Sequence, residues 1–206
     1  MTNEFAKGVK EEKNRIAEWM QAQQLDDQQI EAVGQAILST QDNKGNNVKK
    51  IFLGGWGRSG DVAKGFAMRL AQLKFDARYL TEPTVPAMSK GDVFIVVSGG
   101  GESLTRPIET ALKIGAMVII VTSFLGSPGA RLSDIRLVIP GREEKEEGAS
   151  LSFFERQLKG IPAFPLGTAF ELLAMVVLDS IIAELAVIKK KTNEDLKREH
   201  SNVPPV

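Results

Sequence analysis

Two glycine-rich stretches carry the residues whose types and spacing could do chemistry. Residues 98–103 read SGGGES and follow a short apolar run that predicts a β-strand. Consecutive glycines let the backbone bend sharply and approach a ligand closely, and a following helix turns unpaired N–H groups and the positive end of its dipole toward the turn. A phosphate suits such a turn, although a tight strand-to-helix connection would account equally well for this stretch alone.

The second stretch, GGWGRSG at residues 54–60, repeats the same order of strand, glycine loop and helix. Its Gly55, Gly57 and Gly60 satisfy the G-x-G-x-x-G pattern of dinucleotide-binding proteins. The acidic residues downstream, however, do not stand at a clean strand end, where a ribose-binding carboxylate is expected. Dinucleotide binding would also leave the other glycine turn unexplained, so the two loops together favour a phosphate site.

Apolar runs that alternate with helical patterns predict the scaffold behind these loops. We count five strands, nearly all apolar, and such strands indicate a parallel sheet covered by helices on both faces. Amphipathic helices at residues 3–22 and 26–40 precede the sheet and are expected to pack on the main domain or on a partner subunit. The sequence is thus expected to form a single α/β domain over residues 1–206.

The domain is expected to have three parts, with N-terminal helices over residues 1–45 and the sheet core over 48–140. The last part, 141–206, holds a polar loop or partly helical insertion, a long helix from about residue 166 to 188, and a charged tail. The long helix is apolar on most sides, which predicts burial all round, in the core or against another subunit. In the tail, Thr192 is an expected N-cap, with Asp195 in capping-box position.

Composition excludes several classes of function. The 206 residues carry equal numbers of acidic and basic side chains, so no general attraction for nucleic acid is expected. The absence of cysteine excludes disulfides and thiolate sites, and a single histidine makes a histidine-based metal site improbable. Carboxylates interrupt the long apolar stretch, which argues against a membrane span, and the charged N-terminus is unlike a signal peptide, so we expect a cytoplasmic protein.

Several segments, in order and spacing, resemble the 6-phospho-3-hexuloisomerases, a family within the sugar isomerase (SIS) domain proteins. They are GRSGDVAKGFAMRLAQL, TEPTVPAM, VVSGGGES, PLGTAFELLAMVVLDSIIAEL and REHSN. The resemblance implies a three-layer αβα sandwich with a five-stranded parallel sheet. It also implies reversible conversion of D-arabino-hex-3-ulose 6-phosphate to D-fructose 6-phosphate in the ribulose monophosphate pathway, with no metal or organic cofactor.

The resemblance also implies roles for individual residues. Glu171 is the candidate base, and His200 is expected to assist proton transfer. Because His200 lies far along the chain from both glycine loops, we expect it to reach an active site across a subunit interface of a homo-oligomer, a dimer or a tetramer. Without the resemblance, Glu171 would be a helix N-terminal glutamate and His200 a solvated surface group. The expected substrate-binding residues are Arg58, Ser59, Ser98, Gly99, Gly100, Gly101, Glu102 and Ser103.

The chain departs from the family pattern at four positions. Gly100 stands where a serine is usual, Ser103 replaces a threonine, and Glu199 replaces an arginine beside the tail histidine. Loss of one hydroxyl contact would lower phosphate affinity about ten- to hundredfold if nothing compensated. Asp61 adds a carboxylate next to the first loop, which would repel a phosphate unless it pointed away. These departures keep a second hypothesis open, that of a SIS domain that senses a sugar phosphate without turning it over.

Overall fold

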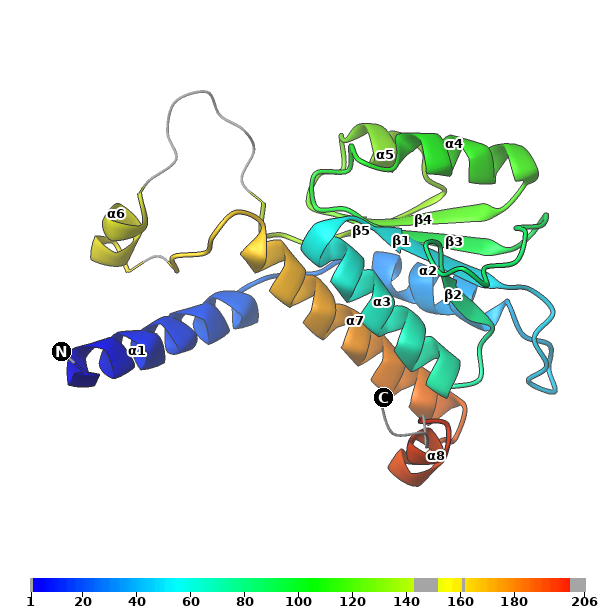
Figure 1. Cartoon of the computed structure of the whole chain (residues 1–206), viewed down its shortest axis with the longest axis horizontal. Helices are drawn as coiled ribbons and strands as arrows, with labels where there is room; N and C mark the ends of the chain where they lie inside the picture. Colours follow the sequence, from blue (N-terminus) through cyan, green and yellow to red (C-terminus); the bar gives the residue numbers. More distant parts are fainter. Residues whose placement is uncertain (1, 143–151, 161, 201–206) are drawn as a thin grey trace.

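A computed structural model describes residues 2–142, 152–160 and 162–200 and has a parallel sheet at its centre (Figure 1). The sheet has five strands in the order β2-β1-β3-β4-β5, and every neighbouring pair is parallel. The strands are β1 (Ile51–Gly55), β2 (Ala77–Tyr79), β3 (Val93–Val97), β4 (Met117–Thr122) and β5 (Ile135–Val138). All residues of β1 and β3 are buried, as their continuous apolar runs predict, and the predicted five-stranded parallel sheet is confirmed.

Helices cover both faces of the sheet (Figure 1). Helices α2 (Asp27–Leu38), α3 (Gly57–Gln72) and α7 (Thr168–Ile188) form the larger layer, and α4 (Thr105–Ile114) and α5 (Pro128–Leu132) form the other. Because side chains alternate along a strand, β1 sends Leu53 into the first layer's core and Phe52 into the second. The predicted three-layer αβα sandwich is therefore confirmed.

The connections leave β1 and β3 in opposite directions. From β1 the chain passes through α3 to β2 at one edge, whereas from β3 it passes through α4, on the opposite face, to β4. Such a reversal opens a crevice at the carboxyl ends of the two strands, where α/β proteins bind ligands. Both glycine-rich loops lie at this point.

The long helix α7 is buried on one side only within the single chain. It begins at Thr168, and it buries one side against α2 and α3. The other side is open in this chain, where Met175 is 46%, Val176 48%, Val187 69% and Ile188 58% exposed. The sequence predicts burial of this helix in the core or against another subunit, and the open apolar side leaves the second alternative as a prediction. Within the described residues, no helix is long and apolar enough to cross a membrane.

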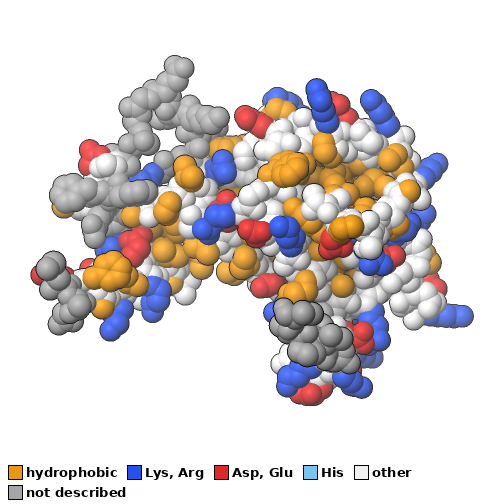
Figure 2. All heavy atoms as spheres, in the orientation of Figure 1, with side chains coloured by type: hydrophobic (Ala, Val, Ile, Leu, Met, Phe, Trp, Pro, Cys, Tyr) orange, Lys and Arg blue, Asp and Glu red, His pale blue; other side chains and the backbone are white. Residues whose placement is uncertain are grey.

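Helix α1 (Thr2–Gln21) extends from the body as an arm (Figure 1). Its second half contacts the segment before α7: the Ala163 N–H donates to the Glu12 carboxylate at 2.6 Å, and Trp19 makes an edge-to-face contact with Phe164, with centroids 5.1 Å apart. Toward its start, Phe5 is 78% exposed. Figure 2 shows hydrophobic side chains at the surface of the arm and where the arm meets the body.

Two short helices complete the described chain. Helix α6 (Phe153–Leu158) lies in the predicted polar insertion, whose residues 143–151 fall outside the described residues. Helix α8 (Asn193–Arg198) follows α7 and carries the tail. The predicted Thr192 N-cap and its capping box with Asp195 are both present.

Candidate functional site

A cleft of about 720 Å³ lies at the carboxyl ends of β1, β3 and β4. Its walls come from three successive strand ends: Trp56 after β1, the glycine loop after β3, and residues 123–128 after β4. Parallel strands bring these segments together because all their carboxyl ends meet at one edge of the sheet. Of the sequence-predicted residues, the structure places Ser59, Ser98, Gly99, Gly100, Glu102 and Ser103 in the wall of this cleft.

The carbonyl groups of the glycine loop are anchored inside the protein. The Gly99 carbonyl accepts hydrogen bonds from the Ser123 N–H at 3.0 Å and the Thr122 hydroxyl at 3.1 Å. The Gly101 carbonyl accepts from the Gly129 N–H at 2.8 Å. These bonds tie the loop to the segments that follow β4, so its shape is set before any ligand arrives.

Most amide N–H groups of the same loop, in contrast to these carbonyls, remain available to a ligand. The N–H of Gly101 donates to the side chain of Ser98 at 3.1 Å, which closes the turn. In the described part of the chain, the amides of Gly99, Gly100, Glu102 and Ser103 donate to no acceptor. A loop whose Gly99 and Gly101 carbonyls are turned inward and bonded, and whose amides are open, is suited to an anion.

Gly101 is required by both backbone conformation and space. Its φ of +67° lies in the left-handed region, and a Cβ there would stand 2.0 Å from the Ser127 hydroxyl oxygen. Ser127 is itself buried and caps α5, accepting from the Ala130 N–H at 3.3 Å. The Gly101 position therefore couples the loop to the neighbouring helix.

The first glycine loop has a packing explanation. A Cβ at Gly55 would meet the Ser59 carbonyl oxygen at 2.8 Å, and one at Gly60 would meet the Gly55 carbonyl oxygen at 2.8 Å. The glycines thus let α3 approach β1 closely, and the Tyr79 hydroxyl donates to the Gly55 carbonyl at 2.7 Å. The dinucleotide-like spacing is accounted for by this contact between strand and helix.

Glu171 lies in the first turn of α7, and its side chain is only 9% exposed. The Nε of Arg58 is 2.8 Å from its Oε2, so the predicted base and the predicted Arg58 form an ion pair. The N–H is not aligned with the carboxylate, and Oε2 has no hydrogen-bond partner among the described residues. Neither residue lines the cleft, but the neighbouring Phe170 packs against the glycine loop, with its Cδ1 2.8 Å from a Cβ built at Gly99.

The sequence reasoning missed residues that contribute to the cleft. The segment after β4, including Ser123, Phe124 and Leu125, and the side chain of Arg142 after β5 both line it. Their positions after consecutive parallel strands were the available signal, since the same rule located the other two loops. Arg142 is the only cation among the described residues that line the cleft, and Glu102 is the only carboxylate.

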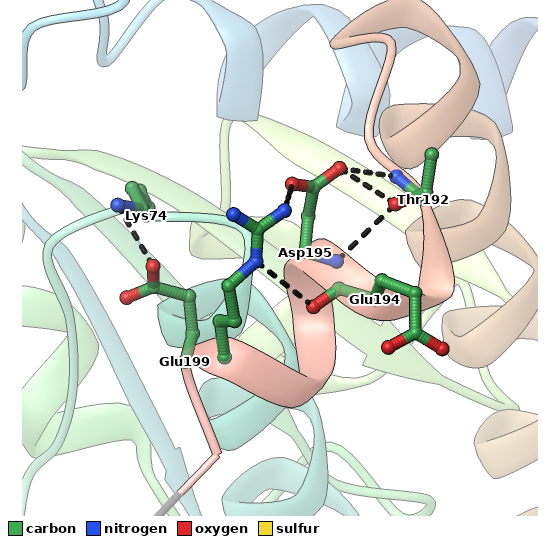
Figure 3. A network of polar contacts seen from close by, with 6 residues as sticks. Lys74, Thr192, Glu194, Asp195 and Glu199 are labelled. Atoms are coloured by element: carbon green, nitrogen blue, oxygen red, sulfur yellow. Dashed lines mark hydrogen bonds and ion pairs between the residues drawn. The ribbon is translucent and has the colours of Figure 1, made fainter.

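His200 lies away from the cleft of its own chain. From Glu171 to the end of α7 is about 25 Å, at ~1.5 Å per helical residue, and α8 and the tail lie at that far end (Figure 1). Figure 3 shows how the tail is held there: Lys74 Nζ is 2.8 Å from Glu199 Oε1, and Thr192 N–H donates to the Asp195 carboxylate at 2.8 Å. The N–H and then the hydroxyl of Thr192 hold the pKa of Asp195 below its ordinary value.

One departure from the family pattern, Asp61, does not disturb the glycine loop. The Asp61 side chain is 69% exposed, pairs with Lys64 Nζ at 3.2 Å and does not line the cleft. It therefore does not oppose an anion in the glycine loop at close range. At Gly100, in contrast, a side chain would have room, because the nearest atom to a built Cβ is Arg142 Nη1 at 3.9 Å.

Comparison with known proteins points to one family. A family model described as SIS domain matches residues 46–163. A protein of Aeropyrum pernix, named only as uncharacterized, is 40% identical over 75% of this chain and 74% of its own length. A 3-hexulose-6-phosphate isomerase of Methylomonas aminofaciens is 32% identical over 81% of this chain and 85% of its own. The crystal structure of MJ1247 from Methanococcus jannaschii has a TM-score of 0.71 at 24% identity, covering 96% of this chain and 99% of its own.

Proposed function

The chain belongs to the SIS domain family, and on this premise we propose that it is a ketose-phosphate isomerase that interconverts D-arabino-hex-3-ulose 6-phosphate and D-fructose 6-phosphate. Relatives named 3-hexulose-6-phosphate isomerase, at 32%, 31% and 30% identity, support this reaction. The observation that carries the proposal is the buried Glu171 carboxylate, ion-paired with Arg58 and one residue from the side chain that packs on the glycine loop.

The glycine loop is the proposed holder of the phosphate. Its open amides at Gly99, Gly100, Glu102 and Ser103 supply donors, and the hydroxyl of Ser103 lies in the same wall. Holding the phosphate at the sheet edge leaves the sugar carbons to extend toward the start of α7. Binding energy at the phosphate then orients carbons that do not touch the loop.

The chemistry requires one proton to move between neighbouring carbons. Glu171 removes the proton from C2 of the 3-ketose, and the electron pair forms the C2–C3 double bond of an enediolate as the C3 oxygen takes up a proton. The C2 hydroxyl then gives up its proton and becomes the carbonyl as Glu171 returns its proton to C3. The substrate is both oxidised and reduced, so no external electron acceptor enters the balance. Arg58 holds the carboxylate in place as a positioning residue, at 2.8 Å from Oε2.

His200 is proposed to act in the site of a second copy of the chain. It lies at the end of α7 opposite Glu171, and the exposed apolar side of α7 supplies a surface for such a copy, with Val187 and Ile188 next to the tail. In that site it would transfer protons to and from the substrate oxygens.

The test is proton exchange at carbon in D₂O. Fructose 6-phosphate incubated with the protein is expected to gain deuterium at C3 and to yield the 3-ketose, both followed by NMR. Glu171→Gln is expected to lower the rate about 10²- to 10⁴-fold, the contribution of a positioned base. Glu109→Gln, on the exposed side of α4, is the matched control and should leave it unchanged. Mixing Glu171→Gln with His200→Gln chains should restore part of the activity if sites are shared.

A sugar-phosphate sensor is the second candidate, favoured by the missing hydroxyl at Gly100 and by the absence of Glu171 from the residues described as lining the cleft. A sensor would be stabilised against heat by fructose 6-phosphate and yet produce neither exchange nor 3-ketose. That pair of results would refute the isomerase proposal.

A further inference from the structure

We propose that Arg142 is the cation that binds the substrate phosphate in the cleft, in place of the hydroxyl that Gly100 lacks. The inference rests on the proposed placement of a phosphate at the glycine loop. It assigns to Arg142 the phosphate contact that the family resemblance implies for Arg58.

Two glycines make room for the guanidinium group. A Cβ at Gly99 would stand 2.8 Å from Arg142 Nε, and a Cβ at Gly167 would stand 2.9 Å from both Nε and Nη2. The side chain therefore lies between the glycine loop and the turn that leads into α7. Its main-chain N–H donates to the Ser123 hydroxyl oxygen at 3.2 Å, which fixes the start of the side chain in the opposite wall.

Charge distinguishes the two arginines near the loop. The Arg58 Nε lies 2.8 Å from the buried carboxylate of Glu171, so its charge is already compensated. The Arg142 side chain has neither a hydrogen bond nor an ion pair with any other described residue. Its N–H groups are open, and they lie beside the open amides of Gly99 and Gly100. Guanidinium and amide donors together match the oxygen atoms of a phosphate.

The cleft needs such a cation. Its described lining contains one carboxylate, Glu102, which opposes a dianion, and Arg142 is the charge that offsets it. Arg142 Nη1 is also 3.9 Å from a Cβ built at Gly100, so a serine hydroxyl there would fall beside the guanidinium. The two donors serve the same region of the loop, and one can substitute for the other.

The experiment measures binding of inorganic phosphate and of fructose 6-phosphate by titration calorimetry. Arg142→Met keeps an unbranched apolar stem and removes the charge, and we expect about ten- to hundredfold weaker binding of both ligands. Arg142→Lys keeps the charge and should stay closer to the parent than to Arg142→Met. Lys113→Gln, an exposed cation in the last turn of α4, is the control for net charge and should bind as the parent does.

A second comparison tests the exchange of donors. Gly100→Ser added to Arg142→Met should recover part of the lost affinity, whereas Gly100→Ser in the parent should change it less. Circular dichroism and urea unfolding of each variant show that the folded protein is being compared. Equal affinity of Arg142→Met and parent, or equal loss in Arg142→Met and Lys113→Gln, overturns the inference.

Experiments can distinguish a failure of the Arg142 inference from a failure of the proposed function. A parent that binds phosphate through Arg142 but exchanges no deuterium refutes the isomerase and upholds this inference. A parent that exchanges deuterium while Arg142→Met binds normally refutes only the inference. A parent that binds neither ligand refutes the phosphate site on which the inference depends.

Discussion

Replacing Gly101 with alanine should weaken the fold more than any neighbouring change in the glycine loop. Its φ of +67° costs an L-residue about 1–2 kcal/mol. The new methyl group would also stand 2.0 Å from the Ser127 hydroxyl oxygen and 2.5 Å from its Cβ. Ser127 is buried and caps α5, so it cannot move away without losing that cap, and overpacking of this kind costs about 1–3 kcal/mol. The expected loss in unfolding free energy is therefore about 2–5 kcal/mol.

Gly100→Ala is the matched control, one residue earlier in the same loop. Its φ is outside the left-handed region, and the nearest atom to the new Cβ is 3.9 Å away. Alanine at such a position restricts the unfolded chain and is expected to raise stability by about 0.4–1 kcal/mol. The two substitutions add the same methyl group and should differ in sign.

Urea unfolding followed by far-UV circular dichroism measures both changes. A Gly101→Ala protein within 1 kcal/mol of the parent, or a Gly100→Ala protein as unstable as Gly101→Ala, would refute the reasoning. The slope of unfolding free energy against urea should stay constant, since neither change alters the surface exposed on unfolding.

Two further predictions concern charge. Arg58→Met leaves the buried Glu171 carboxylate without its cation, and because Arg58 is itself 62% exposed we expect a modest loss of about 1 kcal/mol in urea unfolding. Arg58→Met should lower the free energy of unfolding clearly less when it is made in the Glu171→Gln protein. In the tail, the lowered pKa of Asp195 means that its bonds to Thr192 stabilise α8 above the ordinary carboxyl pKa of 3.8 and are lost as pH falls through the lowered value. The protection of α8 amides against hydrogen exchange, relative to the intrinsic rate at each pH, should therefore fall below about pH 4, and Thr192→Val should remove most of that dependence.

Much of the fold was predictable from local pattern. The apolar runs at β1, β3 and β4 are buried on both faces, which is why they read as continuous rather than alternating sequences. The glycine loops were also predictable, because a strand, a glycine turn and a helix in succession place the turn at the carboxyl edge. Which side of α7 faces the core was not predictable, since the exposed apolar side and the core side have the same residue types.

The candidate site was predictable only in part. Loop residues 98–103 are contiguous, so their pattern is visible in the sequence. The position of the Arg142 side chain depends on contacts between segments that are distant in the chain, because Gly99 and Gly167 leave the space that it occupies. No periodicity or spacing reports such a contact. The ion pair between Arg58 and Glu171 could not be predicted from the sequence either, because the two residues lie in the first turns of helices that are far apart in the chain.

The Arg58–Glu171 ion pair connects α3, which follows the first glycine loop, with α7, which carries the proposed base. Arg58 lies in the first turn of α3 and Glu171 in the first turn of α7, and the two helices pack along each other in the same layer. A shift of either helix would therefore change the distance between the carboxylate and the glycine loop. Phe170 would move with Glu171 in such a shift, and its ring fills the space beside Gly99. The packing of α3 against α7 thus sets the position of the proposed base, and the open side of α7 is where a second copy of the chain could influence it.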